Sequence, residues 1–227
     1  CFNDDYNDGL YNRIYPNALV TVKPTADDAF FLQLDDSTTL LPVNIKSSPF
    51  GSKEVRALVN LYAVDKPSGE YDQAVFVNWI DSILTKPIAE DLGVKNDSVY
   101  GTDRIDIIRD WVNIVEDGYL TLRFRIPRGY GNTVHFINLL QSTDPETPYE
   151  LEFRHNAYGD LEGEWGFGLV AFNLDSLPDT KGETVKLKLK WKSYNGGDKT
   201  LVFDYCTGKS IPGEPELAAI RNQLNLK

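Results

Sequence analysis

The stretch Val185-Lys186-Leu187-Lys188-Leu189-Lys190-Trp191-Lys192 alternates apolar and basic residues without a break. Successive side chains of a β-strand point to opposite faces of the sheet, so this pattern predicts a strand with one buried face and one solvated face. Shifting the strand by one residue would bury the four lysines in place of the four apolar side chains. Because burying an unpaired ammonium group costs several kcal/mol, the register of this strand is strongly specified.

The same two-residue period recurs on both sides of this stretch. It predicts strands at residues 120–126 and 149–153, and further strands at 18–23, 29–34, 55–64, 74–79, 106–115, 134–140, 164–174 and 200–205. Turns are predicted at Asp117-Gly118 and at Asn195-Gly196-Gly197-Asp198, where glycine permits the backbone geometry of a tight hairpin. Only two short helices are expected, at 88–92 with Gly93 as its stop and at 214–225.

This distribution of strands predicts an all-β protein. Residues 90–103, rich in Asp, Asn, Gly and Ser, are the predicted boundary between two domains. About five strands precede it, which suits a small closed barrel at 17–103, and about seven follow it, which suits a β-sandwich at 104–227 with a short C-terminal helix. Residues 1–16 are expected to form an acidic tether.

Composition excludes several function classes. With 41% hydrophobic residues the chain has ample material for packed cores, and no apolar run reaches the length of a membrane span. The net charge of −11 argues against nucleic acid as a partner, because phosphate backbones are bound by Lys and Arg. Two cysteines and two histidines leave little material for a metal centre, and neither a metal nor a cofactor is expected.

Cys1 opens a chain that contains no methionine, and an acidic, amide-rich stretch follows it. The arrangement resembles a mature bacterial lipoprotein, in which signal peptidase cuts before a cysteine that then carries acyl chains. We therefore expect Cys1 to be a lipid anchor to the outer membrane. The acidic stretch resembles the export signal of cell-surface lipoproteins of Bacteroides-type bacteria. The alternatives are a disulfide between Cys1 and Cys206, and a tether that is simply solvated.

Two glycine motifs resemble nucleotide-binding signatures but lack the required context. Residues 166–171 match G-x-G-x-x-A, yet apolar residues alternate straight through them, so they are interpreted as a strand with glycines at a bulge or crowded crossing. Gly208-Lys209-Ser210 resembles the end of a P-loop, but Phe203 stands where the first glycine belongs. Neither stretch is expected to bind phosphate.

No set of residues forms a coherent catalytic constellation, and no catalytic residue is assigned. His135 and His155 are interpreted as packed or surface imidazoles. Asp160, Glu162 and Glu164 beside Trp165 suggest a glycosidase, because two carboxylates flanking a sugar can cleave a glycosidic bond. A surface turn between Gly159 and Gly163 explains the same cluster in a chain with 34 acidic residues.

Several stretches resemble the NigD-like lipoproteins of Bacteroidetes. They are residues 18–24, 30–36, 39–42, 80–86, 186–191 and 201–205. The resemblance covers nearly the whole chain and implies an N-terminal OB-like barrel, a C-terminal β-sandwich and a lipid anchor. It also implies a link to bacteriocin immunity, and it brings no catalytic residues with it.

The predicted binding surfaces follow from charge and from the OB-like fold. Lys186, Lys188, Lys190 and Lys192 can form an anion-binding strip, or else a solvent face that keeps a strand from unwanted pairing. OB barrels bind oligonucleotides or oligosaccharides, which makes Trp79, Tyr62 and Tyr71 candidate stacking groups, with core packing as the alternative.

Three hypotheses remain. The first is a non-enzymatic surface lipoprotein that binds another macromolecule, with a bacteriocin as one such partner. The second is a glycan-binding or glycoside-active module of a surface polysaccharide system. The third is a purely structural envelope protein, which would have no concave site.

Replacing the predicted lipid-bearing residue tests the anchor. We expect Cys1→Ala, expressed with the native signal peptide, to abolish metabolic labelling by palmitate and to release the protein from membranes, because the acyl chains have no other attachment point. Membrane retention of the unlabelled variant would contradict the anchor.

Overall fold

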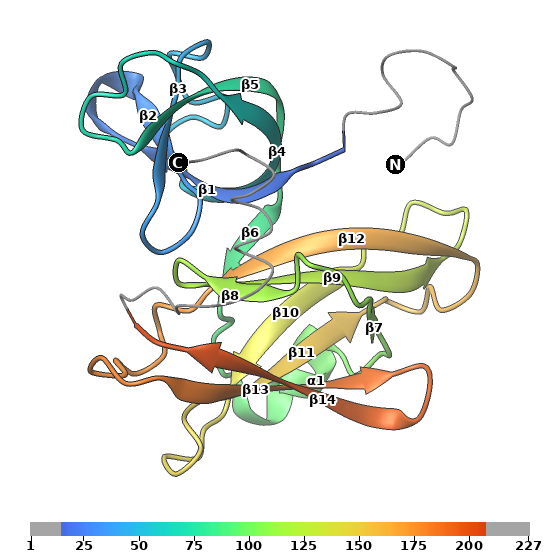
Figure 1. Ribbon diagram of the computed structural model, residues 1–227. Helices are drawn as coiled ribbons and strands as arrows, with labels where there is room; N and C mark the ends of the chain where they lie inside the picture. The colour runs from blue at the N-terminus through green and yellow to red at the C-terminus, as the bar shows by residue number, and fades with distance from the viewer. Residues whose placement is uncertain (1–14, 208–227) are drawn as a thin grey trace. The chain divides into compact units, whose positions relative to one another are not determined.

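The computed structural model describes residues 15–207. The predicted lipid anchor at Cys1, nearly all of the tether, the glycine motif at 208–210 and the helix at 214–225 lie outside the described residues. The chain divides into two compact units between Ser82 and Ile83. Each unit is built almost entirely from β-strands (Figure 1), so the predicted all-β class is confirmed.

The first unit is a closed barrel of five strands, hydrogen-bonded in the order β1-β2-β3-β5-β4 with β4 returning to β1. Closure leaves the sheet without a free edge. Its apolar side chains alternate along the strands, and Val20, Val22 and Leu32 are fully buried. The elements are β1 (Ala18–Pro24), the 3-10 helix η2 (Ala26–Asp28), β2 (Phe30–Gln33), β3 (Thr39–Pro42), β4 (Val55–Ala63) and β5 (Gln73–Ser82).

The second unit is a sandwich of two sheets (Figure 1). One has the order β6-β12-β9-β7, with β8 paired to β9, and the other has the order β10-β11-β13-β14. The elements are β6 (Leu84–Pro87), the 3-10 helix η3 (Gly93–Lys95), α1 (Asn96–Tyr100), β7 (Asp106–Ile107), β8 (Ile114–Glu116), β9 (Tyr119–Arg128), β10 (Phe136–Gln141), β11 (Glu150–Asn156), β12 (Glu164–Asn173), β13 (Val185–Ser193) and β14 (Gly197–Tyr205).

The alternating stretch forms β13, in the register that its sequence predicts. Leu187 and Leu189 are fully buried and Trp191 nearly so, while all four lysines are exposed. Val185, at the start of the strand, is only partly buried against the same core. The inward rows of both sheets meet in one apolar cluster, to which β9 contributes Leu120, Leu122, Phe124 and Ile126.

The turn at Asp117-Gly118 and the glycine motif of β12 also follow the sequence, whereas Gly197 and Asp198, predicted to lie in the second turn, begin β14. Asp117 and Gly118 join β8 to β9 with positive φ at both residues, as a tight hairpin requires. Residues 166–171 lie within β12, as the alternation indicates, and not at a strand-to-helix turn. Cys206, after the end of β14, is a free and half-buried cysteine.

The predicted strand at 106–115 is wrong in its middle, where a loop separates β7 from β8. The Asn113 side chain takes over the bonds that a continuous strand would make, because its amide donates to the Ile108 carbonyl (2.6 Å) and its oxygen accepts from the Arg123 N–H (2.7 Å). Side-chain amides that satisfy the backbone in this way compete with regular strand pairing.

The predicted helix at 88–92 is also wrong. This segment is irregular, and Ala89 donates to the Leu139 carbonyl (2.9 Å). Gly93, the expected stop, is instead the first residue of η3, with φ of 60°. The Asp91 carboxylate accepts from the Gly93 N–H (2.9 Å), which fixes this reversal.

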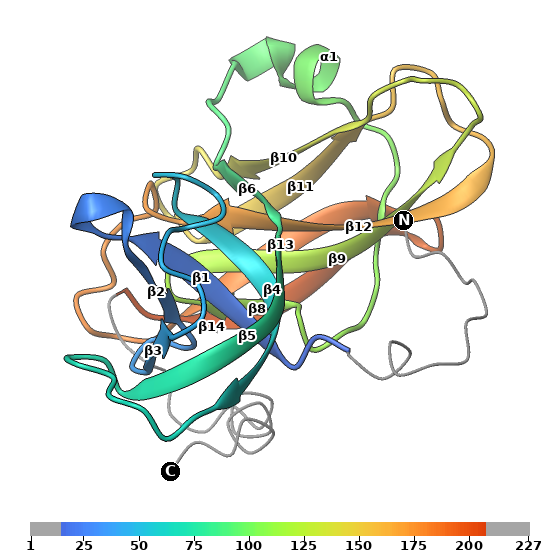
Figure 2. The same cartoon turned by 90° about the horizontal axis from the view of Figure 1, so that it is seen from above.

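Residues 90–103, where the sequence predicts a domain boundary, belong to the second unit. The Tyr100 hydroxyl donates to the Glu90 carbonyl (2.6 Å), and α1 lies beside β10 and β11 (Figure 2). The units instead divide between β5 and β6, because β6 pairs in parallel with β12 of the sandwich.

The register of β13 has a measurable consequence. We expect Leu189→Ala to lower the free energy of unfolding by roughly 2–5 kcal/mol, because it leaves a cavity at a fully buried site. The matched surface change Lys188→Ala should alter it by no more than about 0.5 kcal/mol. Urea unfolding of both variants measures the difference, and equal losses would contradict the register.

Candidate functional site

The predicted lysine strip lies on the outer face of β13, between two rows of acidic residues. Parallel pairing with β11 places Glu150 beside Lys188 and Glu152 beside Lys190. The Lys190 ammonium lies 3.4 Å from a Glu152 carboxylate oxygen. Lys188 forms no ion pair with any residue in the described part of the chain, so its charge is available to a ligand.

The opposite border of the strip is acidic at its two ends, with Val202 and Thr200 between them. Antiparallel pairing with β14 places Asp204 beside Lys186 and Asp198 beside Lys192. The Lys186 ammonium forms an ion pair with Asp204. The strip is therefore a ladder of alternating charges across three strands, and not a uniformly basic patch.

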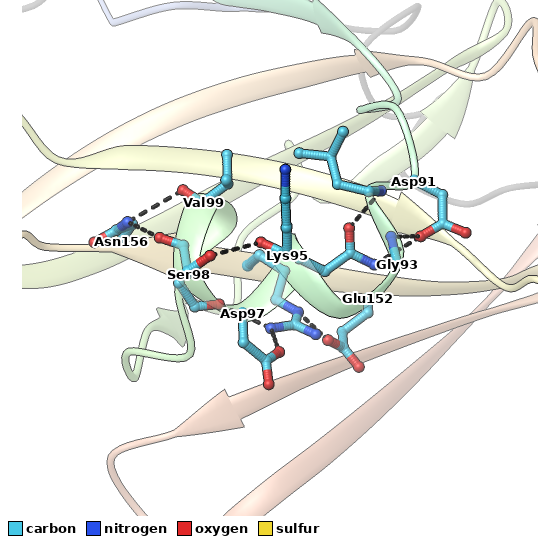
Figure 3. A network of polar contacts seen from close by, with 12 residues as sticks. Asp91, Gly93, Lys95, Asp97, Ser98, Val99, Glu152 and Asn156 are labelled. Carbon is cyan, nitrogen blue, oxygen red and sulfur yellow. Dashed lines mark hydrogen bonds and ion pairs between the residues drawn. The ribbon is translucent and has the colours of Figure 1, made fainter.

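Arg154, the next outward residue on β11, connects this sheet to α1. Its guanidinium donates to the Asp97 carboxylate (2.8 Å) and to the Gly101 carbonyl (2.9 Å), and it forms an ion pair with Glu152. Figure 3 shows this network, in which the acidic side chains of Asp97 and Glu152 lie on the same side of the short helix.

The segment of α1 is held tightly against β11. The Asn156 side chain donates to the Val99 carbonyl (3.1 Å), and Gly101 has a φ of 81°. A Cβ at residue 101 would lie 2.3 Å from the His155 carbonyl oxygen, so only glycine fits there. These contacts give the sheet a fixed raised wall along one side of the charged ladder.

Between this wall and the sheet lies a groove of about 420 Å³. Its volume lies within the range of ligand-binding clefts. It is polar, and its lining combines the cations Arg154, Lys188 and Lys190 with three carboxylates. The residues that line it are Asp91, Asn96, Leu140, Gln141, Ser142, Thr143, Glu150, Leu151, Glu152, Arg154, Lys188 and Lys190.

The predicted aromatic residues of the barrel form two separate contacts. Tyr62 is 49% exposed and stacks on Phe76 with ring centroids 5.3 Å apart. Tyr71 stacks instead on Phe31 at 5.0 Å, and partial burial raises its pKa, with a smaller contribution from the Glu70 carboxylate. Trp79 is half-buried on β5, opposite Asn60 of β4.

The two histidines meet inside the sandwich, a pairing that sequence reasoning missed. His135 Nδ1 lies 2.9 Å from His155 Nε2, and the two rings are stacked. His135 Nε2 lies 2.8 Å from an Asp160 carboxylate oxygen, and His155 Nδ1 lies 2.8 Å from the Arg104 carbonyl oxygen. The signal that could have found this pair is the β10–β11 register, which pairs Ile137 with His155 and so makes His135 its diagonal neighbour.

The hydrogen bonds fix the tautomer of His155. The Arg104 carbonyl only accepts, so His155 carries its proton on Nδ1. Neutral His155 then accepts at Nε2 from Nδ1 of His135, whose other nitrogen faces the Asp160 carboxylate.

The pKa shifts of His155 and Asp160, at the two ends of this chain, agree with a neutral His155 and an ionised Asp160. Burial lowers the pKa of His155, partly opposed by its bond to the Arg104 carbonyl, which favours the neutral ring. The hydrogen bond from His135 lowers the pKa of Asp160. A glycosidase acid needs a raised pKa, so Asp160 has the opposite property.

Trp165, the aromatic residue of the glycosidase alternative, is 44% exposed on β12. The Arg125 guanidinium lies over its ring, 4.3 Å from the centroid. Arg125 is itself bound to Asp106 at 3.1 Å.

Within residues 15–207, no group of three His, Cys, Asp or Glu side chains converges on a point that could hold a metal ion. In the same part of the chain, no helix is long and apolar enough to cross a membrane.

Comparison with protein families assigns both units. Residues 19–83 match the NigD-like N-terminal OB domain, and residues 87–205 match the NigD-like C-terminal beta sandwich domain. The chain belongs to the NigD-like family. The resemblance seen in the sequence is therefore confirmed, and so are the OB-type barrel and the β-sandwich.

Solved structures of NigD-like and similar proteins share this architecture. A Parabacteroides distasonis protein, provisionally described as toxin-related, is 38% identical, with a TM-score of 0.70 over 92% of this chain and 98% of its own. A NigD-like immunity protein from Bacteroides caccae is 20% identical, with a TM-score of 0.59 over 84% and 96%. A Bacteroides fragilis protein provisionally described as a lipoprotein is 12% identical, with a TM-score of 0.55 over 85% and 98%.

The last two relatives establish the shared fold alone. The comparison with curated proteins gave no match.

The histidine pair predicts an acid-sensitive stability. The unfolded state binds the His155 proton near pH 6.5, whereas burial lowers the folded-state pKa. The unfolded state therefore holds more protons below that pH, so this contribution is present above about pH 6.5 and is lost as the pH falls.

We expect the free energy of unfolding to fall between pH 7.5 and pH 5, and to fall less in His155→Gln. That variant should also be about 1–3 kcal/mol less stable at pH 7.5, because a buried hydrogen bond is lost. Urea unfolding at both pH values measures this, and an identical pH dependence in the two proteins would contradict the assignment.

Proposed function

We propose that this NigD-like chain is a non-enzymatic binding protein of the bacterial cell envelope, anchored to the outer membrane through Cys1 and exposed at the cell surface. The proposed binding surface is the charged ladder with the groove beside it. The observation that carries the proposal is the position of Lys188, which forms no ion pair within residues 15–207, in the groove beside the wall built by α1.

The ladder suits recognition of a macromolecule better than capture of a simple anion. Lys186 and Lys190 already have acidic partners, so a polyanion would have to displace them. A partner carrying both charge signs can instead match the rows of Glu, Lys and Asp in one register. Complementarity of this kind favours specificity and rapid association over raw affinity.

The proposed partner class is a secreted antibacterial protein or peptide, that is, a bacteriocin. Support comes from the NigD-like relative of Bacteroides caccae that is described as an immunity protein. Recognition of a bacteriocin by binding needs an exposed surface of fixed shape and no catalytic group.

A glycan is the second candidate ligand. Trp165 and Phe167 are 44% and 54% exposed on β12, and exposed aromatic rings can stack on sugars. The first candidate is favoured because Arg125 already covers Trp165 and because Asp160 is committed to His135.

Protection of a sensitive host tests the proposal. We expect the chain, expressed with its native signal peptide, to raise survival against the culture supernatant of a bacteriocin producer. Lys188→Glu should reduce protection by about tenfold or more, because close like-charge contacts at an interface cost several kcal/mol.

Lys53→Glu is the matched control, because it changes the same charge at an exposed residue of the barrel. Loss of protection in both variants would contradict the ladder as the binding surface. Absence of protection, together with retardation of the protein in polysaccharide gels that Trp165→Ala removes, would favour the glycan candidate.

A further inference from the structure

Toward the N-terminal end of β12, glycines occupy the positions that face the core. Phe172 and Val170 are fully buried in the core, and the next two inward positions are Gly168 and Gly166. These are the glycines of the G-x-G motif. The sandwich core therefore ends on one sheet as a strip of bare backbone.

Side chains of the neighbouring strand β9 pack directly against the backbone of these two glycines. A Cβ at residue 168 would lie 2.6 Å from the Phe124 ring, and one at residue 166 would lie 3.0 Å from the Arg128 side chain. The expectation of a crowded crossing is confirmed at Gly168. Glycine here allows Phe124 and the Arg128 stem to lie flat along the sheet and so to form the floor of a cavity.

The cavity has a volume of about 460 Å³ and lies entirely within the second unit. Its lining is mixed. Phe124 and Ile126 come from one sheet, Ile137 comes from the other, and Leu84 and Val134 are exposed at its mouth, while Arg128, Asn132, Thr133 and His135 add polar groups. Ligand sites in proteins have this size and combine apolar walls with polar groups that fix orientation.

The ionisable groups of the lining are both bases. Arg128 is exposed at the rim, where its charge contributes to the lowered pKa of the Asp160 carboxylate. His135 forms part of the wall, and both of its nitrogens are held by Asp160 and His155. Of the two, Arg128 is the side chain whose donors make no hydrogen bond within residues 15–207, so they can bind a ligand.

We propose that this cavity binds a small apolar carboxylic acid, with its chain between the sheets and its carboxylate on Arg128. An arginine guanidinium can bind a carboxylate through two parallel hydrogen bonds. The apolar side chains account for the chain. None of the lining residues is acidic, and the adjacent Asp160 carboxylate is already bound by His135. This site is independent of the charged ladder and of the proposed function.

Calorimetric titration of the full chain with octanoate and with octan-1-ol tests the proposal. We expect saturable one-to-one binding of octanoate that is about tenfold tighter than that of octan-1-ol, the difference being the charge-assisted bond to Arg128. Octanoate affinity should also weaken with added salt, because the ion pair lies at an exposed rim.

Three variants complete the test. Arg128→Gln should weaken octanoate binding about tenfold and leave octan-1-ol unchanged. Val134→Trp should weaken both ligands by narrowing the mouth at an exposed position where folding is not at risk. Arg109→Gln, which changes an exposed arginine outside the cavity, should alter neither.

Several results would overturn the site. With the unchanged chain, they are absence of saturable octanoate binding at millimolar concentration and equal affinity for octan-1-ol. With the variants, they are unchanged octanoate affinity in Arg128→Gln or Val134→Trp, and an equal loss of octanoate affinity in Arg128→Gln and Arg109→Gln.

Discussion

The register of β13 is the constraint on which the second unit depends. This strand lies between β11 and β14, and its apolar row enters the common core of the sandwich. Successive side chains of a strand alternate between its two faces, so one register sets both. The register that buries Leu187 and Leu189 therefore also aligns Lys188 with Glu150 and Lys190 with Glu152. The outer charged ladder is thus positioned by hydrophobic burial on the opposite face, and it needs no stabilising energy of its own. The surface ion pairs between its side chains therefore need to contribute little to the stability of the fold.

The core ends differently on the two sheets at one end of the sandwich. On β12 the inward row passes from Phe172 and Val170 to two glycines, whereas the inward row leading into β10 ends in the imidazole of His135. The imidazole pair replaces apolar packing with three hydrogen bonds, one of which reaches Asp160 in a connecting loop. Polar groups buried in this way are stable only when all partners are present, so this end of the sandwich depends on protonation while the rest depends on burial.

The sequence predicts the regular parts of this structure and misses the parts made by side chains from distant segments. Period-two alternation located nearly all the long strands, because burial of one face dominates their energetics. It failed at Asn113, where one side-chain amide replaces ladder bonds, and at residues 88–92, where Asp91 and Gly93 reverse the chain. The histidine pair required the hairpin register, and the groove required the placement of α1 against β11. Neither is encoded in a local pattern.

The β10–β11 hairpin links the charged groove to the apolar cavity. Leu140 and Arg154 line the groove, whereas Ile137 lines the cavity and His155 holds the cavity wall through His135. Lys86 of β6 also fixes this hairpin, because its ammonium donates to the Ile137 carbonyl (2.6 Å) and the Asn138 side chain (2.7 Å), and burial lowers its pKa. Coupling between two sites requires an element with two alternative arrangements that both ligands bias. Because the bonds of Lys86 hold this hairpin on the side away from the groove, we expect ligand binding in the cavity to leave recognition at the ladder unchanged.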